Sequence, residues 1–222
     1  MRVDRASLSH LWPITCAPNP MNSKASDIIA GIVSRGAAPV LKAAGFKKTA
    51  LRFYRRRGEV VQVVGFQLSQ GNFADKGRFY INVGIGFDKL WQMDSKPMPD
   101  RPKEHGGHFY RRLEDLLPDV PFDGNVSGST DIDATAIELR DRMILLVSLL
   151  DPINSTDALL EQNWLHVGAD LLLKARMHYV AGDFQAAIAE VKAAAAFFSN
   201  RQASTPLDII RRENMATLQQ YL

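Results

Sequence analysis

Cysteine is almost absent from this sequence: among its 222 residues only Cys16 carries a thiol. One thiol cannot close an intramolecular disulfide, and it cannot build a zinc site from several thiolates. The chain also has no run of apolar residues that approaches the roughly 20 needed to cross a bilayer. We therefore expect a cytoplasmic protein, in a compartment where thiols stay reduced, with no membrane segment.

Sequence motifs for catalysis are missing as well. No serine lies in the strand–turn–helix context of a nucleophile elbow, and Gly84-Ile-Gly86 is too short for a dinucleotide-binding loop. These glycines are better explained as a place where another segment approaches the backbone closely. Asp131-Ile-Asp133 precedes a predicted helix, where negative charge interacts favourably with the helix dipole. The sequence identifies no enzyme and no cofactor, and we favour a protein without catalytic activity.

What the chain does have is the composition of a globular protein, with 46% hydrophobic and 23% charged residues. The net charge is only +3, yet the first 60 residues carry eleven Lys and Arg against three Asp and Glu. This asymmetry fits an acidic partner or an anionic polymer, and it equally fits a basic surface that only water contacts. The sequence does not indicate an oligomeric state.

The first 20 residues differ in composition from the rest. They contain prolines at positions 13, 18 and 20 and no complete signal-peptide core, so we predict a poorly ordered leader over residues 1–20. Met21 precedes a helix-like pattern and is an alternative biological start. Residues 21–222 are predicted to form a single α+β domain.

An N-terminal helix is predicted from a cap at Ser26-Asp27 to about Ala44, kinked or split at Pro39 and ended by Gly45. Three strand-like segments follow this helix: Leu51–Arg55, Val60–Ser69 and Arg78–Phe87. Arg56-Arg57-Gly58 is predicted to be the turn between the first two. We therefore expect an antiparallel meander of three or more strands.

Alternation in the third strand is the clearest pattern in the chain. Every second residue from Phe79 to Phe87 is apolar, and the residues between them are polar or glycine. If the second and third strands pair as a hairpin closed by Ser69 and Arg78, then Val60, Val64, Phe66 and Leu68 join the apolar face of the third strand. The opposite face then collects five residues that we take as a candidate binding surface: Gln67, Ser69, Arg78, Tyr80 and Asn82. The alternative is an ordinary solvated sheet face.

The second half of the chain is predicted to be mainly helical. A loop over residues 90–102 leads to a short amphipathic helix, Phe109–Leu117, and a further loop lies at residues 123–129. A longer helix is predicted from about Asp131 to Leu150, capped by Ser129 or Thr130, with four buried residues: Ile137, Ile144, Val147 and Leu150. The remaining segments are a helix capped at residues 155–157, a helical hairpin at 165–180 and 184–198, and a final helix at 207–222.

Two other groups of residues could carry a function. Six basic residues lie close together in sequence and could contact phosphates: Lys47, Lys48, Arg52, Arg55, Arg56 and Arg57. The pair His105 and His108 could bind a metal, but two imidazoles need a third ligand and supporting residues, so we predict no metal site.

Several blocks of the sequence resemble the bacterial family known as domain of unknown function 4304. They are Leu41-Lys-Ala-Ala-Gly-Phe-Lys-Lys48 with Phe53-Tyr-Arg55, Val63-Val-Gly-Phe-Gln-Leu-Ser69, and Gly77-Arg-Phe-Tyr-Ile-Asn-Val-Gly84. The resemblance covers roughly residues 24–150 and leaves residues 151–222 as a helical extension. It implies no established activity and no catalytic residues. Some relatives look like components of bacterial toxin–immunity loci, which implies protein binding.

These observations favour a non-enzymatic protein-binding module, of immunity type, with a protein as its partner. A metal-dependent hydrolase using the loop of His105 and His108 is one alternative. Binding of nucleic acid through the basic hairpin at Arg55–Arg57 is the other, and we do not favour it.

Overall fold

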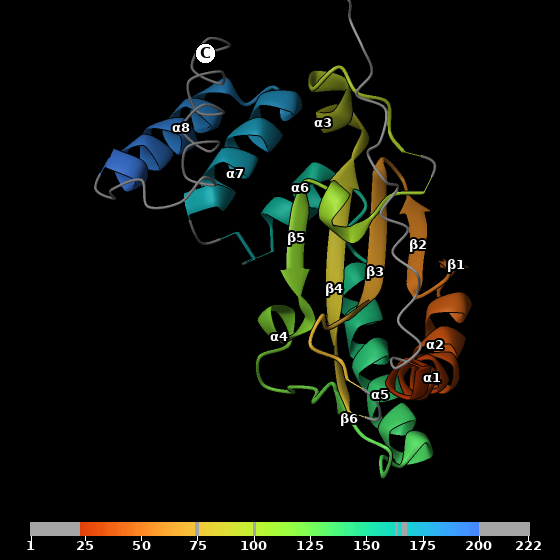
Figure 1. The fold of residues 1–222 in the computed structure, drawn as a ribbon. Coiled ribbons are helices and arrows are strands. Elements are labelled where there is room, and N and C mark those ends of the chain that lie inside the picture. The colour runs from red at the N-terminus through yellow and green to blue at the C-terminus, as the bar shows by residue number, and fades with distance from the viewer. Residues whose placement is uncertain (1–22, 74–75, 100, 163, 166–167, 200–222) are drawn as a thin grey trace, which may run out of the picture.

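The computed structural model describes residues 23–73, 76–99, 101–162, 164–165 and 168–199 (Figure 1). The predicted leader, the alternative start at Met21 and the predicted final helix at 207–222 lie outside the described residues. Within them, an N-terminal helical segment, a six-stranded antiparallel sheet and a mainly helical C-terminal part form the predicted α+β architecture. No helix in these ranges combines the length and apolar composition that a membrane span requires.

The sheet is a meander in which five strands lie side by side in chain order. These strands are β1 (Lys47–Thr49), β2 (Arg52–Arg57), β3 (Val60–Leu68), β4 (Gly77–Phe87) and β5 (Phe109–Arg112). The short strand β6 (Asn125–Val126) pairs with the beginning of β4. The prediction of three or more antiparallel strands is confirmed, although β1, β5 and β6 were not predicted as strands.

The predicted register of the central hairpin is confirmed. Val60 lies opposite Phe87 and Leu68 opposite Phe79, and the backbone N–H of Ser69 donates to the carbonyl of Arg78 at 2.8 Å. Val60, Val64, Phe66 and Leu68 of β3 therefore share one face with the apolar residues of β4, and we call it the inner face. The other, which we call the outer face, carries the polar and glycine positions of β4 together with Val61 and Val63 of β3. The predicted turn is displaced, because β2 continues through Arg57 and the chain reverses at Gly58, which has a φ of +57°.

Helices cover the inner face of the sheet (Figure 1). They are α1 (Ser23–Ile32), a π-helical turn at Val33–Ala37, α2 (Ala38–Ala43) and α5 (Ile132–Leu150). Buried residues of these helices form one hydrophobic cluster with the inner face, which includes Phe53, Val64 and Ile85. Burial of this apolar surface is the main force that holds the helices on the sheet.

The N-terminal helical segment differs from its prediction at Ser26-Asp27 and agrees with it at Pro39 and Gly45. The helix begins at Ser23, so Ser26 and Asp27 lie inside it rather than at its cap. The α-helix is split just before Pro39, as predicted: the π-helical turn separates α1 from α2, and Pro39 lies in the first turn of α2. Gly45 ends the segment with a φ of +85°, as predicted.

The stretch predicted as a helix at Phe109–Leu117 is a strand followed by one helical turn. Phe109–Arg112 forms β5 because it pairs with β4, and only α4 (Leu113–Leu116) is helical. The predicted loop at residues 90–102 is also partly wrong, since α3 (Asp88–Met93) includes Leu90–Met93. A 3₁₀ turn at Glu104–Gly106 precedes β5.

Helix α5 has the predicted extent, but its predicted cap and two of its predicted buried residues are wrong. Its N-cap is Asp131, whose side chain accepts hydrogen bonds from the backbone of Asp133 and Ala134 at 3.0 Å each. Ile137 and Ile144 were predicted to be buried, but they are 59% and 49% exposed. The buried face consists of Ala136, Leu139, Met143, Leu146 and Leu150.

The C-terminal helices follow the predicted pattern. Helix α6 (Thr156–Leu160) is capped by Ser155, and α7 (Gly168–Ala181) and α8 (Phe184–Ser199) form the predicted hairpin. Leu173 and Met177 of α7 belong to the main core, and α7 and α8 share a smaller apolar cluster. In Figure 1 this hairpin lies at the end of the sheet where α3 lies.

Candidate functional site

The outer face of the sheet is ordered in rows by its strand pairing. One row runs from Arg52 through Gly65 and Asn82 to Arg112, and the next begins at Tyr54. Because side chains alternate along each strand, Gln67, Ser69, Arg78 and Tyr80 project from this same face. The structure therefore brings the five residues of the candidate binding surface to one side of the sheet.

The part of the outer face nearest α3 is covered. A Cβ atom added to Gly86 would lie 2.0 Å from the ring of Trp91, and one added to Gly84 would lie 2.1 Å from the carbonyl oxygen of Glu104. Such distances leave no room for a side chain, so α3 and the 3₁₀ turn pack directly against the backbone at these glycines. The prediction that another segment approaches Gly84 and Gly86 closely is confirmed.

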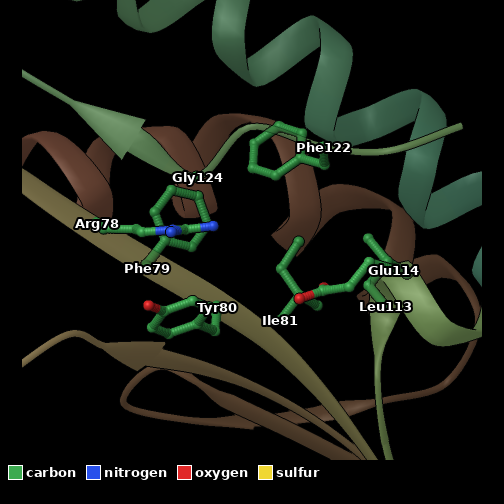
Figure 2. A pocket seen from close by; sticks show the side chains of 8 residues that line it. All are labelled: Arg78, Phe79, Tyr80, Ile81, Leu113, Glu114, Phe122 and Gly124. Carbon is green, nitrogen blue, oxygen red and sulfur yellow. The ribbon is translucent and has the colours of Figure 1, made fainter. Parts of the chain in front are cut away.

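The rest of the outer face is open at Tyr80. The Tyr80 ring is half-buried between two guanidinium groups, with Arg112 at 4.1 Å and Arg78 at 4.9 Å from its centre. These distances are within the range of cation–π contacts. Figure 2 shows Arg78 and Tyr80 beside each other on β4. We call the open region, made of Gln67, Arg78, Tyr80 and Arg112, the Tyr80 surface.

The other two predicted residues, Ser69 and Asn82, are less accessible. Ser69 is half-buried and its Oγ accepts a hydrogen bond from the backbone of Gly71. Asn82 is only 1% exposed, and its Nδ2 donates to Oε1 of Gln67 at 2.8 Å. Asn82 therefore helps to fix the position of the Gln67 side chain, but it is itself too buried to contact another molecule.

Arg112 completes the Tyr80 surface but was not among the predicted residues. Its stretch was interpreted as a helix, in which Arg112 would not be placed beside β4. The sequence of β5 carries no signal of its own that would place Arg112 against Tyr80, because this neighbourhood depends on the pairing of β5 with β4.

The hollow beside Tyr80 is too small for a substrate. It is lined by Arg78, Phe79, Tyr80, Ile81, Leu113, Glu114, Phe122 and Gly124 (Figure 2) and has a volume of about 20 Å³. A volume of this order holds about one water molecule. The hollow beside Tyr80 is therefore too small to enclose a small-molecule ligand.

Positive charge predominates on the Tyr80 surface. Among the described residues, Arg78 has no carboxylate within ion-pair distance, while Arg112 lies 3.7 Å from the carboxylate of Glu114. Glu104, beside this surface, forms an ion pair with Arg52 at 2.8 Å. Burial acts to raise the pKa of Glu104, but the hydrogen bond and charge of Arg52, a backbone hydrogen bond and the charge of His105 together outweigh it, so the pKa lies below its usual value. Glu104 is therefore a charged partner of Arg52.

The six residues of the predicted basic patch do not share one surface. Lys47, Arg52 and Arg56 project from the outer face, whereas the other three, Lys48, Arg55 and Arg57, project from the inner one. All four arginines form ion pairs with carboxylates: Arg52 with Glu104, Arg56 with Asp88, and Arg55 and Arg57 with Asp151. These pairs reduce the charge that phosphates could meet.

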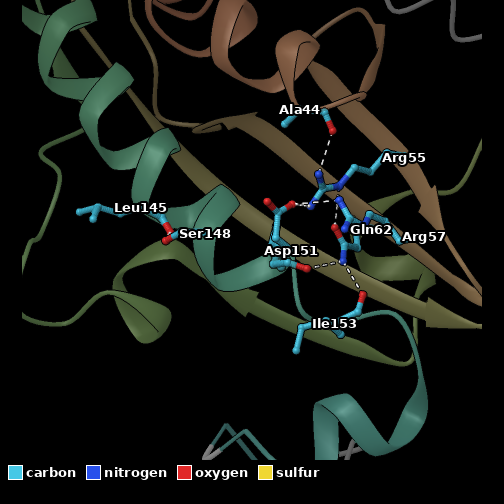
Figure 3. Close-up of polar contacts among 9 residues, drawn as sticks. Ala44, Arg55, Arg57, Gln62, Leu145, Ser148, Asp151 and Ile153 are labelled. Carbon is cyan, nitrogen blue, oxygen red and sulfur yellow. Dashed lines mark hydrogen bonds and ion pairs between the residues drawn. The ribbon is translucent and has the colours of Figure 1, made fainter.

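Arg55 is a structural residue of the inner face. It is 4% exposed, its Nε donates to Gln62, its Nη1 donates to the carbonyl of Ala44, and its Nη2 lies 2.8 Å from Asp151 (Figure 3). Burial lowers the pKa of Arg55, and the hydrogen bond and charge of Asp151 act against this shift. Gln62 extends the network by donating to the carbonyls of Leu150 and Ile153 at 2.7 Å each. The network joins the ends of α2 and α5 to the sheet.

The two histidines lie in different environments. His105 is exposed on the 3₁₀ turn, whereas the His108 side chain is 7% exposed and packs against Trp91 with ring centres 4.9 Å apart. The Nδ1 of His108 accepts a hydrogen bond from the backbone N–H of Phe87. Burial, with the nearby charge of Arg176, lowers the pKa of His108 to about 4. No group of three or more potential metal ligands occurs in the described part of the chain.

Comparison with protein families gives one match. Residues 37–150, about half of the chain, match the family described as Domain of unknown function (DUF4304). The chain belongs to this family. The DUF4304 region begins later than the predicted residue 24 and ends at the predicted residue 150, so it contains the whole sheet and α5. No curated protein and no solved structure matches the chain.

Proposed function

We propose that this DUF4304 protein is a non-enzymatic, cytoplasmic protein-binding module of immunity type, and that the Tyr80 surface contacts its partner. The observation that carries the proposal is the Tyr80 ring held between the guanidinium groups of Arg78 and Arg112. Tyrosine and arginine are among the residues most enriched where binding energy concentrates. Since two guanidinium groups already contact the ring, binding would cost little additional side-chain entropy.

The charge of the surface indicates the chemistry of the partner. Arg78 is exposed and has no carboxylate partner among the described residues, and Arg112 is exposed beside it. A partner with an acidic patch would complement these charges and would be guided to the surface over long range. We therefore propose a protein with an acidic surface, and the resemblance to toxin–immunity components favours a toxin encoded beside this chain.

The geometry favours neither alternative function. The imidazoles of His105 and His108 differ in exposure, and the Nδ1 of His108 is engaged by the backbone of Phe87. The arginines of the basic hairpin are each paired with a carboxylate, and Arg55 is buried. Both arrangements support a structural role for these residues.

The test is a binding measurement with the purified products of the adjacent genes. We expect one of them to form a stable complex, and we expect Tyr80→Ala to raise its Kd about 10- to 100-fold. Gln67→Ala should raise the Kd less, because Gln67 lies at the edge of the surface and its loss leaves both cation–π contacts in place.

Arg140→Ala provides the matched control, because Arg140 is an exposed arginine on α5, the helix that covers the inner face. Its Kd should equal that of the wild type. Circular dichroism and thermal unfolding would verify that every variant is folded. The proposal fails if no adjacent gene product binds, or if Tyr80→Ala binds as tightly as Arg140→Ala.

A further inference from the structure

A second feature of the outer face is a groove near the β1–β2 edge, separate from the Tyr80 surface. It has a volume of about 420 Å³, and six of the residues that line it are Lys47, Tyr54, Arg56, Val61, Met98 and Pro102. This volume falls within the roughly 300–1,000 Å³ of sites that bind small molecules. We call it the Tyr54 groove.

Strand pairing explains why these residues meet. Lys47 lies opposite Tyr54, and Arg56, two residues further along β2, lies opposite Val61. All four therefore project from the outer face, with Lys47 and Arg56 on either side of the Tyr54 position. Met98 and Pro102, from the segment that follows α3, complete the lining.

The lining of the groove combines an apolar floor with three basic residues, and one of them, Arg55, is paired with Asp151. Val61 is buried and packs in one apolar cluster with Tyr54 and Met98. The guanidinium of Arg56 is neutralised by Asp88, which it contacts through both of its terminal nitrogens. Lys47 is exposed and has no carboxylate within ion-pair distance among the described residues. One uncompensated positive charge therefore lies beside an apolar surface.

We propose that the Tyr54 groove binds a small organic carboxylate whose body is aromatic or branched and aliphatic. Its carboxylate would pair with the ammonium group of Lys47, and its body would lie on Tyr54, Val61 and Met98. A single uncompensated cation matches a monovalent carboxylate better than a doubly charged phosphate. The site is independent of the Tyr80 surface and of any protein partner.

The neighbouring residue Lys48 gives a matched control for this site. Lys47 and Lys48 are both exposed on β1 and carry the same charge, but they project to opposite faces because side chains alternate along a strand. The ammonium of Lys48 lies 5.8 Å from the ring centre of Phe53 on the inner face. Replacing either lysine by methionine removes the same charge from the protein.

The experiment is calorimetric titration of the full chain with phenylacetate, and with 2-phenylethanol as a neutral probe of similar shape. We expect phenylacetate to bind with a Kd on the order of 0.1–1 mM, as its small size allows. Lys47→Met should weaken this binding at least about fivefold, and Lys48→Met should leave it unchanged. Tyr54→Ala should weaken both probes, because it removes the apolar floor.

Three outcomes would overturn the proposal. The first is that phenylacetate does not bind to the wild type at millimolar concentration. The second is that 2-phenylethanol binds as tightly as phenylacetate, which would show that the ion pair contributes nothing. The third is that Lys47→Met and Lys48→Met weaken binding equally, which would show an effect of overall charge and not of the groove.

Discussion

The two faces of one sheet are closed in opposite ways. The inner face presents large apolar side chains such as Phe53, Val64 and Ile85, which interlock with helices on the other side. The outer face presents Gly65, Gly84 and Gly86 in its covered part. Glu104 and Trp91 of the covering segments fill the space above these glycines. The same strands therefore serve as a packed layer on one side and as a flat platform on the other.

This difference explains where each face is polar and what its polar groups do. On the inner face, the polar groups of Arg55 and Gln62 are buried and bonded to backbone carbonyls, so they hold helices in place. On the outer face, the side chains of Arg78 and Arg112 are exposed and contact Tyr80. The buried network of Arg55 and Gln62 and the exposed arginines of the Tyr80 surface thus lie on opposite faces of one sheet.

The largest effect that would test this separation is expected at Arg55. Arg55→Ala removes the donors that satisfy Gln62 and the carbonyl of Ala44, and it removes packing on the ring of Phe46, whose centre lies 4.4 Å from the guanidinium. We expect a loss of about 3–4 kcal/mol in the free energy of unfolding, measured by urea denaturation.

Arg57→Ala is the control for Arg55, because Arg57 pairs with the same carboxylate of Asp151 but is exposed. An exposed ion pair contributes little, so this variant should lose less than about 1 kcal/mol. Equal losses in the two variants would show that the buried network is not what holds α2 and α5 to the sheet.

The next effect concerns pH and belongs to the covered part of the outer face. The pKa of His108 is lowered to about 4, so His108 stays neutral in the folded protein while it takes up a proton in the unfolded chain below about pH 6.5. Stability should therefore be lost as the pH falls from about 6.5 to about 4, by up to about 3 kcal/mol. The difference in unfolding free energy between wild type and His108→Gln, measured across this range, should decrease by that amount.

His105→Gln serves as the control for this pH series. His105 is exposed on the 3₁₀ turn, three residues before His108. Its stability curve should run parallel to that of the wild type between pH 7 and pH 4. A parallel curve for His108→Gln as well would contradict the assignment of the pH dependence to His108.

The smallest of the three effects is expected for an added methyl group at Gly84. Gly84→Ala places a Cβ 2.1 Å from the carbonyl oxygen of Glu104, so the covering turn must move, at a cost of about 2 kcal/mol. Gly31→Ala in α1 makes only an ordinary contact of 3.6 Å with Ile132 and should stabilise the helix by up to about 1 kcal/mol. Thermal unfolding measures both, and an unchanged Tm for Gly84→Ala would mean that the platform is not closely covered.

Prediction from sequence succeeded where a pattern was set by one strand pair. The alternation from Phe79 to Phe87 fixed the register with β3, because a shift by one residue would have placed apolar side chains on both faces. All five predicted surface residues lie on the outer face, because they alternate with the residues of the core. Their accessibility did not follow from alternation, since Asn82 is buried by its surroundings.

Prediction failed where structure depends on distant segments. Lys47–Thr49 has no apolar pattern and becomes β1 only by pairing with β2, and Phe109–Arg112 becomes β5 only by pairing with β4. In α5, apolar residues occupy nearly every position of Ile144–Leu150, so periodicity alone could not show that Ile144 is exposed and Leu146 is buried. Arg112 was not predicted as part of the candidate site because β5, the strand that carries it, was not predicted.

The π-helical turn at Val33–Ala37 determines the direction in which the side chains of α2 point around the helix axis. Ile32 and Leu41 are nine residues apart, which in an uninterrupted α-helix would point them about 180° away from each other. Both are nonetheless fully buried in the same core, because the wide turn absorbs one residue without advancing the helix by a full step. Deleting a single residue there would place Ile32 and Leu41 eight positions apart, about 80° around a regular α-helix, so both would still face the core and the wide turn would no longer be needed.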